Sequence, residues 1–437
     1  MSLKRNCIVK VSKFMKILIV NTQSINHQNA TGITLRSIFK NFNPSDCFEF
    51  YMQPCVVAED ALKIRSERIP PKVCFMRFVA NKFSNTANAS ATVGPNNDKK
   101  TLRSKIRSRL IMCLDFEPVM LARKMVKKIK DFAPDCIYTL GNSIDTMKLA
   151  YKLSKKFNIP IIPHFMDNWQ ASHRYGPRLY PYHLKRTQAW LKKMYERTDK
   201  ALTISPKMAK EYEIRWGKPH YSIMNTVDVE YYHKGCCDTT KKLSESDFIL
   251  TYAGGLHLNR YKSILELGEA IDNHNKSASR KIQLRIYTDE KSRVQYGNLL
   301  SSVKSLDIRN YVPHDRILEV YSSCDALVHI ETFDEDYREF IRYSLSTKIS
   351  EFLSCGKPIL LYSPDDIFVF QYLKEHNAGI VVESSARLDT AISKLVDVKE
   401  NSNMCESAYL LAKQYHDDSY LHKVLFEIFE CDAIPVS

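Results

Sequence analysis

No apolar run in this sequence approaches the roughly 18 to 20 residues that are needed to span a bilayer. The apolar stretch nearest the start, residues 17–20, is too short for a signal-peptide core, and no small-residue cleavage site follows it. It predicts a first buried strand instead, with residues 1–14 as a loose extension. We therefore expect a protein of the cytoplasm.

The twelve cysteines are scattered, and the only close pair is the adjacent Cys236 and Cys237. No CxxC pair or Cys/His cluster has the spacing of metal ligands, which argues against a structural zinc or a disulfide framework. No GxGxxG run occurs either, so the chain lacks a dinucleotide fingerprint.

Length and composition are those of a globular protein with more than one core. Apolar residues make up 44% of the 437 residues and charged residues 26%. This length is too great for one ordinary core and suits two domains plus connections.

Positive charge is in excess, with a formal net charge of +15, and it is concentrated in residues 99–130. Such a stretch attracts nucleic acid, phosphorylated substrates or an anionic membrane. Phe116 is the only aromatic residue between 102 and 130, which argues against nucleic acid. Residues 102–112 have the pattern of a basic amphipathic helix suited to anionic lipid heads, and a solvated packing helix is the alternative.

Short apolar strands alternate with amphipathic helices along the chain, which is the pattern of parallel doubly wound sheets. In the first half, strands are expected at 16–21, 47–52, 72–78, 136–139, 159–165, 201–204 and 222–225, and helices at 32–42, 144–157, 183–197 and 206–216. In the second half, strands are expected at 248–253, 282–287, 308–312, 326–330, 358–361 and 379–382. Six strands with intervening helices make one complete Rossmann-like domain.

The two series of expected strands and helices predict an α/β protein with two Rossmann-like domains. The expected N-terminal domain spans 15–228 and includes a mobile basic insertion around 79–130, since residues 80–100 are rich in Asn, Ser, Ala and Thr. Residues 229–246 show no clear period and form the expected linker. The C-terminal domain then spans 247–407, and 408–437 form a helical tail that is expected to pack back across the linker.

A two-glycine turn follows the first strand of the second half. Gly254 and Gly255 come directly after this strand, and Arg260 precedes the next helix. Glycine lets backbone N–H groups approach phosphate oxygens, and the helix N-terminus adds a favourable dipole. The segment fits a diphosphate site, and equally a tight turn with a surface arginine.

Residues 344–362 contain a second candidate site. The helix expected there has an apolar stripe, and Glu351 lies on a different face from it. Thr347, Lys348 and the free N–H groups of the first turn would point at a ligand over the carboxyl edge of the sheet. Glu351, one turn further in, could bind a ribose diol. The alternative is an exposed helix whose Glu and Lys are merely solvated.

This second stretch resembles the E-x7-E region of the retaining glycosyltransferases of family 4, which have the GT-B fold of two Rossmann-like domains facing across a cleft. Glu351 with CGKPI at 355–359 matches the second half of that motif, and Arg260 stands where the family places a basic residue on the donor diphosphate. The resemblance covers about residues 15–382 and is closest to transferases of bacterial capsule and exopolysaccharide clusters. Other matching segments are HFMDNW at 164–169, TIS at 203–205, NTVD at 225–228, VPHD at 312–315 and CDALVH at 324–329.

The chain departs from this motif where its first glutamate would stand, because Tyr343 cannot supply a carboxylate to the transferred sugar. Glu331 or Asp334 is a candidate replacement for that acid, as a possible sugar contact. The arginine often found beside the first donor-loop glycine is Gly255 here. Phosphate binding must therefore depend on Arg260, Lys348 and backbone N–H groups.

His164 ends an apolar strand and begins a polar loop, and Asp167 follows three residues later. We interpret both as catalytic residues that face the sugar from the N-terminal domain, and a buried structural pair is the alternative. The run DED at 334–336 matches a DxD metal motif. Because GT-B enzymes generally need no bound metal, we interpret it as a solvated loop and expect no metal cofactor.

The resemblance implies transfer of a hexose-type sugar, with retention, from a nucleoside diphosphate sugar to a hydroxyl of a glycan or lipid-linked acceptor. This would serve surface polysaccharide biosynthesis at the inner membrane face, without a nucleic-acid partner. One alternative is a GT-B sugar-nucleotide epimerase, for which no convincing further set of carboxylates and histidines is evident. Another is a non-catalytic subunit that binds nucleotide sugar. Tyr343 favours that subunit, and the intact Glu351, Lys348 and Arg260 oppose it.

Overall fold

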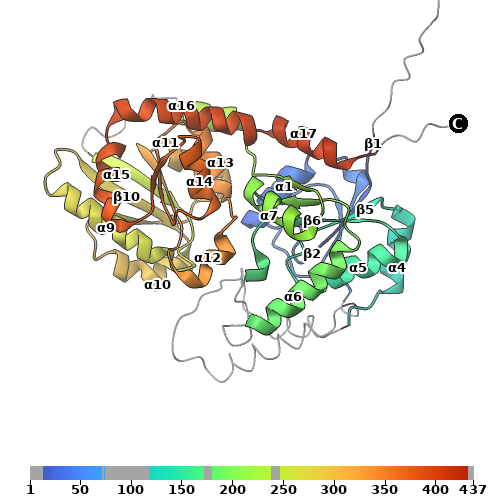
Figure 1. Ribbon diagram of the computed structural model, residues 1–437. Coiled ribbons are helices and arrows are strands. Elements are labelled where there is room, and N and C mark those ends of the chain that lie inside the picture. Colours follow the sequence, from blue (N-terminus) through green and yellow to red (C-terminus); the bar gives the residue numbers. More distant parts are fainter. Residues whose placement is uncertain (1–12, 71–72, 74–117, 172–179, 238–246, 432–437) are drawn as a thin grey trace, which may run out of the picture.

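The computed structural model describes residues 13–70, 73, 118–171, 180–237 and 247–431. Within them, two parallel sheets lie side by side, each with helices on both faces, and two C-terminal helices run along both domains (Figure 1). No helix in the described ranges is long and apolar enough to cross a membrane.

The N-terminal sheet is built on a strand that is buried on both faces. In β2, Ile17 and Ile19 pack on one side, and Leu18 and Val20 pack on the other, as the alternation of side chains along a strand requires. All neighbours in this seven-stranded sheet are parallel. Its order is β4 (Arg65–Arg68), β3 (Cys47–Tyr51), β2 (Ile17–Asn21), β5 (Cys136–Thr139), β6 (Ile161–Phe165), β7 (Ala201–Thr203) and β8 (His220–Ser222).

Helices cover this sheet in two layers. One face carries α1 (Ala30–Phe39) together with the C-terminal α17 (Asp418–Phe429). The other face carries α4 (Arg123–Phe132), α5 (Ile144–Phe157), α6 (Tyr180–Tyr195) and α7 (Pro206–Trp216).

The C-terminal sheet has the order of a Rossmann fold. From edge to edge its parallel strands are β11 (Leu306–Asn310), β10 (Lys281–Thr288), β9 (Asp247–Ala253), β12 (Ala326–Ile330), β13 (Ile359–Tyr362) and β14 (Ile380–Val382). Numbered along the chain this is 3-2-1-4-5-6, so the strand order reverses between β9 and β12. Ligands of open parallel sheets bind outside the carboxyl ends of the strands at such a reversal.

Helices again cover both faces of this sheet. One face packs against α9 (Arg260–Asn275), α10 (Glu290–Leu300) and α15 (Leu388–Leu395). The other packs against α8 (Val229–Cys237), α11 (Ile317–Ser322), α13 (Thr347–Ser354), α14 (Phe368–Glu375) and α16 (Val398–Tyr415). The short α12 (Glu335–Ile341) follows β12.

The C-terminal helices join the two domains. The chain passes from α16 on the C-terminal domain to α17 on the N-terminal domain, seen at the top of Figure 1. His416 lies at this junction, fully buried, with Nδ1 2.7 Å from the Asn225 carbonyl and Nε2 2.9 Å from the Tyr372 hydroxyl. The helical tail begins with α16 at Val398, ten residues before the position expected from the sequence.

The expected two-domain α/β fold is confirmed, and most expected strands differ from the observed ones by one or two residues. The edge strand β4 was not predicted, because its RSER sequence has no apolar alternation. Helix α8 occupies the first half of the segment in which no period was recognised. The strand expected at 72–78 and the loop at 80–100 lie outside the described residues, apart from Val73.

Candidate functional site

The turn after β9 carries the first group of predicted residues. The Gly254 N–H donates to a carbonyl of β10 at 2.9 Å. A Cβ at Gly255 would lie only 2.5 Å from Nδ1 of His257, so the turn is closely packed. Asn259 has a φ of 61°, and α9 starts at the next residue, Arg260. The turn therefore places Arg260 at the carboxyl edge of the sheet, in the first turn of a helix.

Arg260 is held by a carboxylate at the end of the neighbouring strand, β12. Its Nε donates to Oε2 of Glu331 at 3.1 Å, and its Nη2 donates to the same oxygen. Nε2 of His329 lies 3.0 Å from Oε1 of Glu331. Burial raises the pKa of Glu331, but the Arg260 charge and the His329 contact outweigh it and lower the pKa to about 2. Glu331 is therefore ionised at neutral pH, with both oxygens engaged.

Lys348 adds a second cation from another helix. It follows Thr347, the first residue of α13, and its N–H donates to the capping Ser346 hydroxyl at 3.4 Å. Burial lowers the pKa of Lys348, the Glu351 carboxylate opposes this shift, and the Arg260 charge adds to it. The predicted residues of α9 and α13 therefore lie close enough for their charges to interact.

Glu351, one turn further along α13, is buried and already has two partners. Its Oε1 lies 2.9 Å from Nε2 of His314, and its Oε2 accepts from the Tyr321 hydroxyl at 2.6 Å. The Glu351 hydrogen bond raises the pKa of His314, whose side chain is 48% exposed. An exposed helix with solvated charges, the alternative for this segment, does not fit a glutamate that is 3% exposed.

Asp167 reaches the same region from the N-terminal domain. It follows β6 and accepts a hydrogen bond from the Ser344 hydroxyl, at 2.5 Å, across the domain boundary. The pKa of Asp167 is raised to about 7, chiefly by burial. The Ser344 hydrogen bond lowers this pKa, the Glu331 charge raises it further, and the Arg260 charge lowers it. Asp167 therefore lies within electrostatic range of both Arg260 and Glu331.

His164 does not join this group. It is fully buried in β6, and its Nδ1 lies 2.7 Å from the hydroxyl of Tyr138 on β5. Burial lowers the pKa of His164 to about 3, so the ring is neutral at physiological pH. The geometry corrects the expectation that His164 faces the sugar, because a strand residue can point into the core as readily as toward a loop. It is a core histidine whose partner is Tyr138, not Asp167.

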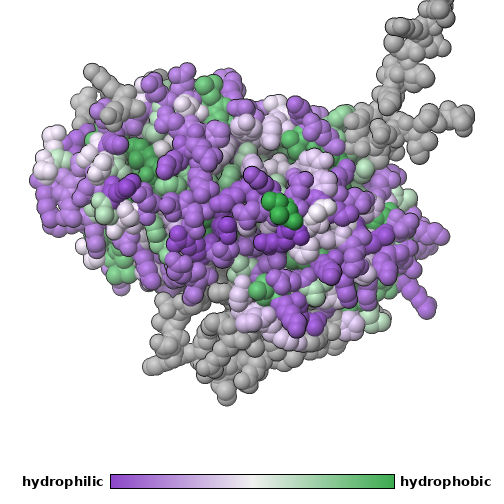
Figure 2. Space-filling model, in the orientation of Figure 1, coloured by the Kyte–Doolittle hydropathy of each residue, from purple (hydrophilic) through white to green (hydrophobic). Residues whose placement is uncertain are grey.

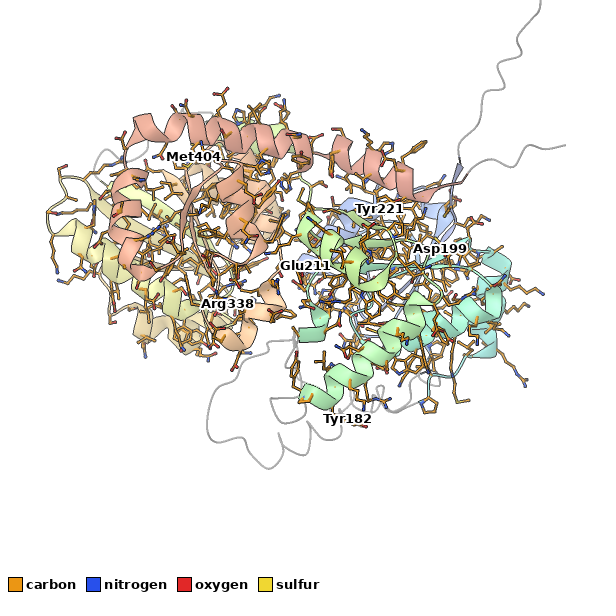
Figure 3. The ribbon with its side chains drawn as sticks, viewed as in Figure 1. Tyr182, Asp199, Glu211, Tyr221, Arg338 and Met404 are labelled. Carbon is orange, nitrogen blue, oxygen red and sulfur yellow. The ribbon has the colours of Figure 1, made fainter. Side chains whose placement is uncertain are left out.

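Tyr343, in the position of the missing first glutamate, points toward the N-terminal domain. Its hydroxyl donates to Glu211 of α7, and its ring packs edge-on against Tyr212 with centroids 6.1 Å apart. Glu211 lies at the border of the two domains in Figure 3. Glu331 and Asp167 are two acids whose charges act on Arg260.

The DED run at 334–336 is not a solvated loop, because α12 begins at Glu335 and Asp334 caps it. Asp334 accepts from the Asp336 N–H at 3.1 Å and from Nδ2 of Asn259 at 2.7 Å. The correction has a local cause, since an aspartate directly before a helix commonly satisfies its first N–H groups. Within the described ranges, no group of three or more His, Cys, Asp or Glu residues could hold a metal ion.

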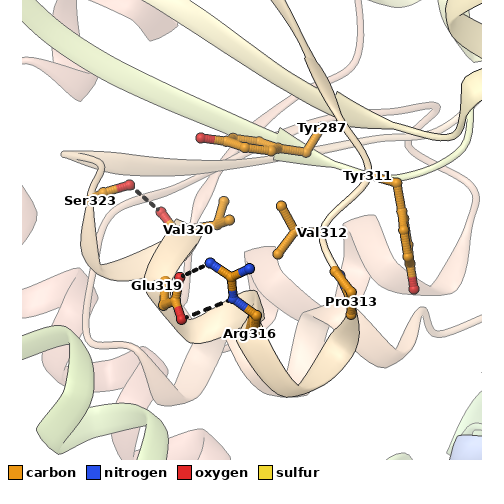
Figure 4. Close-up of a pocket in the computed structure, with 8 residues that line it drawn as sticks. All are labelled: Tyr287, Tyr311, Val312, Pro313, Arg316, Glu319, Val320 and Ser323. Carbon is orange, nitrogen blue, oxygen red and sulfur yellow. Dashed lines mark hydrogen bonds and ion pairs between the residues drawn. The ribbon is translucent and has the colours of Figure 1, made fainter.

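A pocket of about 280 Å³ lies beside His314, at the VPHD segment of residues 312–315. Figure 4 shows Val312 and Val320 toward its middle and the Arg316–Glu319 ion pair, at 2.9 Å, on one side. The residues that line it are Tyr287, Tyr311, Val312, Pro313, Arg316, Glu319, Val320 and Ser323.

The basic surface is broader than the sequence indicated. Residues 99–117, including the expected amphipathic helix at 102–112, lie outside the described residues. Helices α4, α5 and α6 pack on one face of the N-terminal sheet, and the surface over them is mostly hydrophilic in Figure 2. Asp131 is the one exposed acid on these three described helices. Their exposed cations are Arg123, Lys124, Lys127, Lys130, Lys152, Lys155, Lys156, Lys185, Lys192 and Lys193.

Three side chains of the site were not singled out from the sequence: His329, Tyr321 and Ser344. His329 stands in the CDALVH run and Ser344 beside Tyr343, but nothing in either segment indicates its partner. Their partners lie 2, 30 and 177 residues away.

Part of the chain matches a known family of domains, and nearly all of it matches solved structures. Residues 267–428 match the family described as glucosyltransferase 3-like, C-terminal domain. No curated protein sequence matches the chain.

Three structures illustrate the similarity. Anabaena HepE, in complex with UDP and glucose, is 14% identical with a TM-score of 0.60, covering 95% of this chain and 99% of its own. Sucrose-phosphate synthase from Thermosynechococcus elongatus is 12% identical with a TM-score of 0.61, covering 95% and 98%. The α,α-trehalose 6-phosphate synthase from Burkholderia multivorans is 8% identical with a TM-score of 0.60, covering 95% and 96%. The chain therefore has the GT-B fold, with two parallel-sheet domains and interleaved helices.

Proposed function

We propose that this chain is a glycosyltransferase that moves a sugar from a nucleoside diphosphate sugar to a hydroxyl of an acceptor. One observation carries the proposal: Arg260 and Lys348 lie in the first turns of two helices, beside the strand reversal of a Rossmann-like sheet. Two cations and two helix N-termini suit a diphosphate. The similarity of residues 267–428 to a glucosyltransferase 3-like domain supports the same reaction class.

In this proposal the nucleotide lies along the carboxyl edge of the C-terminal sheet. The pocket at Val312 and Pro313 receives the base, and Glu351 with His314 lies at the ribose. Arg260 and Lys348 hold the diphosphate. Asp167 then faces the sugar from the other domain, which is consistent with its nearness to Arg260.

The chemistry needs charge stabilisation at the leaving group. The bond from the anomeric carbon to the β-phosphate oxygen breaks, and a bond to the acceptor oxygen forms. The acceptor proton passes to the departing diphosphate, which leaves with its charge stabilised by Arg260 and Lys348. We propose that the configuration of the anomeric carbon is retained, as the family resemblance implies, so that the acceptor oxygen attacks from the face that the diphosphate leaves. We also propose that the two side-chain cations take the place of a bound metal.

The finer assignment is a hexosyltransferase of surface polysaccharide biosynthesis, with a glycan or lipid-linked acceptor at the inner face of the cytoplasmic membrane. The ten exposed cations on α4, α5 and α6 support contact with an anionic membrane surface. These helices belong to the N-terminal domain, which is the acceptor side in this proposal.

A thermal-shift screen against UDP-, GDP-, ADP- and dTDP-sugars tests the donor, and calorimetry with the best nucleotide measures its affinity. We expect the nucleotide sugars of one base to raise the Tm of the protein. We also expect the matching donor to be hydrolysed slowly, even with EDTA present. No shift with any nucleotide sugar would contradict the proposal. Binding without transfer or hydrolysis would favour the non-catalytic subunit, and a change of sugar configuration without an acceptor would favour the epimerase. Hydrolysis lost in EDTA and restored by Mn²⁺ would contradict the metal-free mechanism.

A further inference from the structure

Glu331 is held rigidly by its backbone at the carboxyl end of β12. Its N–H donates to the Tyr362 carbonyl of β13 at 3.0 Å, and its carbonyl accepts from the Ser263 hydroxyl of α9 at 3.4 Å. Its side chain is 5% exposed. The backbone of Glu331 therefore has a fixed position between the sheet and the helix that carries Arg260.

The two oxygens of Glu331 have different partners. Oε1 is 3.0 Å from Nε2 of His329, whose side chain is 6% exposed, and Oε2 accepts both bonds from Arg260. Without His329, Oε1 would be a buried acceptor with no partner among the described contacts. A carboxylate in that state gains by turning toward other donors, because an unsatisfied buried charge is costly. His329 therefore keeps the carboxylate in the orientation that Arg260 needs.

Glu331 uses only one edge of the Arg260 guanidinium. Nε and Nη2 form that edge, while Nη1 lies 3.4 Å from Nε2 of His257 in the turn after β9. The Arg260 side chain is 16% exposed. A guanidinium has five N–H donors in a fixed fork, so the second edge stays available for an anion.

An arginine that is already fixed binds an anion better than a mobile one. Immobilising a long side chain during binding costs conformational entropy, and a side chain that is already positioned avoids that loss. The competing interpretation is that Glu331 neutralises Arg260 and so weakens anion binding. The two interpretations predict opposite effects of removing the Glu331 charge.

We propose that His329 and Glu331 are positioning residues, which hold Arg260 in the orientation that binds the donor diphosphate. This inference rests on the proposed function, because it concerns the same diphosphate site. Neither residue has to contact the donor. The order of contacts is His329 to Glu331, Glu331 to Arg260, and Arg260 to the phosphate oxygens.

Two substitutions at His329 separate this role from simple packing. A glutamine carries an N–H that can take the place of Nε2, whereas a leucine fills the space without a donor. We expect His329→Leu to weaken binding of UDP and of inorganic pyrophosphate about tenfold by calorimetry, on the scale of one lost charged hydrogen bond. His329→Gln should stay within about threefold of the parent protein. Uridine, which has no phosphate, should bind all three proteins alike.

Glu331→Gln tests the sign of the effect. It should weaken pyrophosphate binding in the same way, and tighter binding would overturn the proposal in favour of neutralisation. Equal pyrophosphate affinity of His329→Leu and the parent protein would also overturn it, while the proposed function would stand. A parent protein that binds neither pyrophosphate nor any nucleoside diphosphate would overturn both. If His329→Leu does not fold, the pyrophosphate affinity of Glu331→Gln relative to the parent protein tests the proposal by itself.

Discussion

The hydroxyl of Ser344 donates to the carboxylate of Asp167 at 2.5 Å, and this hydrogen bond crosses from one domain to the other. It connects the segment before α13, which carries Lys348, to the loop after β6. Asp167 can therefore respond to the charges of the C-terminal site although it belongs to the N-terminal domain.

The raised pKa of Asp167 predicts a pH-dependent stability. The carboxyl titrates near 3.8 in the unfolded chain and at about 7 in the folded protein, where burial and Glu331 favour the neutral form. The folded state binds the extra proton, so Asp167 lowers stability as pH rises from about 4 to about 7, and the full loss remains above pH 7.

Asp167→Asn, which cannot ionise, should therefore be more stable than the parent protein by about 4 kcal/mol at pH 8, because the pKa of Asp167 rises from 3.8 to about 7 on folding and each pH unit is worth ~1.4 kcal/mol. The difference should vanish near pH 4. Asparagine keeps an oxygen that can accept from Ser344, so the cross-domain hydrogen bond survives. Thermal melts from pH 4 to pH 8 measure the effect, and a constant difference over this range would contradict the assigned pKa.

Arg260 is predicted to supply a large part of the diphosphate affinity. Arg260→Gln should weaken UDP binding by about 2 kcal/mol, or roughly 30-fold, because it removes a charge-assisted hydrogen bond. Calorimetry measures the affinity. Arg387→Gln is the control for net charge, since Arg387 is 71% exposed and pairs with Glu383. Equal losses in the two variants would show that net charge, not the Arg260 site, governs binding.

Glu351 is predicted to serve the ribose, and its two internal partners allow a sharp test. Glu351→Ala should weaken UDP binding by about 1–3 kcal/mol and also lower the free energy of unfolding. Tyr321→Phe removes only the buried hydrogen bond at 2.6 Å, so it should lower stability while leaving UDP affinity intact. Unchanged affinity in Glu351→Ala would remove Glu351 from the site. An affinity loss in Tyr321→Phe as large as that in Glu351→Ala would make the effect one of packing.

Lys357, the lysine of the CGKPI run, is predicted to act on stability. Its Nζ donates to the carbonyls of Tyr321 and Ser322 at 2.9 and 3.0 Å, and also to that of Cys324, at the C-terminus of α11. A cation at this end of a helix is favourable.

Lys357→Met should reduce the free energy of unfolding by about 1–3 kcal/mol in urea titrations, because three carbonyls lose a charged donor. Lys291→Met, on an exposed position of α10, should change it by less than about 0.5 kcal/mol. A loss of similar size in both variants would mean that the contacts of Lys357 contribute little.

The basic face of α4, α5 and α6 is predicted to bind anionic membranes. Changing Lys155, Lys156, Lys192 and Lys193 together to Gln should reduce sedimentation with phosphatidylglycerol vesicles, and added salt should have the same effect on the parent protein. Four exposed lysines of the C-terminal domain, changed in the same way, are the control for net charge. Equal pelleting of the parent and the α5–α6 variant would end the membrane proposal.

Where the sequence alone determined the structure, the signals were local. Helices α5 and α7 begin and end where they were expected, because Ser143 and Ser205 cap their first turns, and Asn158 and Gly217 end them in the left-handed conformation. The buried strands were recognisable because parallel strands covered on both faces form short continuous apolar runs. The motifs around Arg260 and Lys348 placed both cations at the carboxyl edge of one sheet, since each lies in the first turn of a helix that leads into the next strand.

Only the tertiary structure decided which side chains meet. His164 points into the core, Tyr343 toward Glu211, and Glu331 toward Arg260, and none of these directions follows from spacing along the chain. Arg260 and Glu331 are 71 residues apart, and they meet because β9 and β12 are neighbours at the strand reversal. Strand order depends on the burial of whole sheet faces, a long-range effect, so the contacts at the site become visible only in the folded chain.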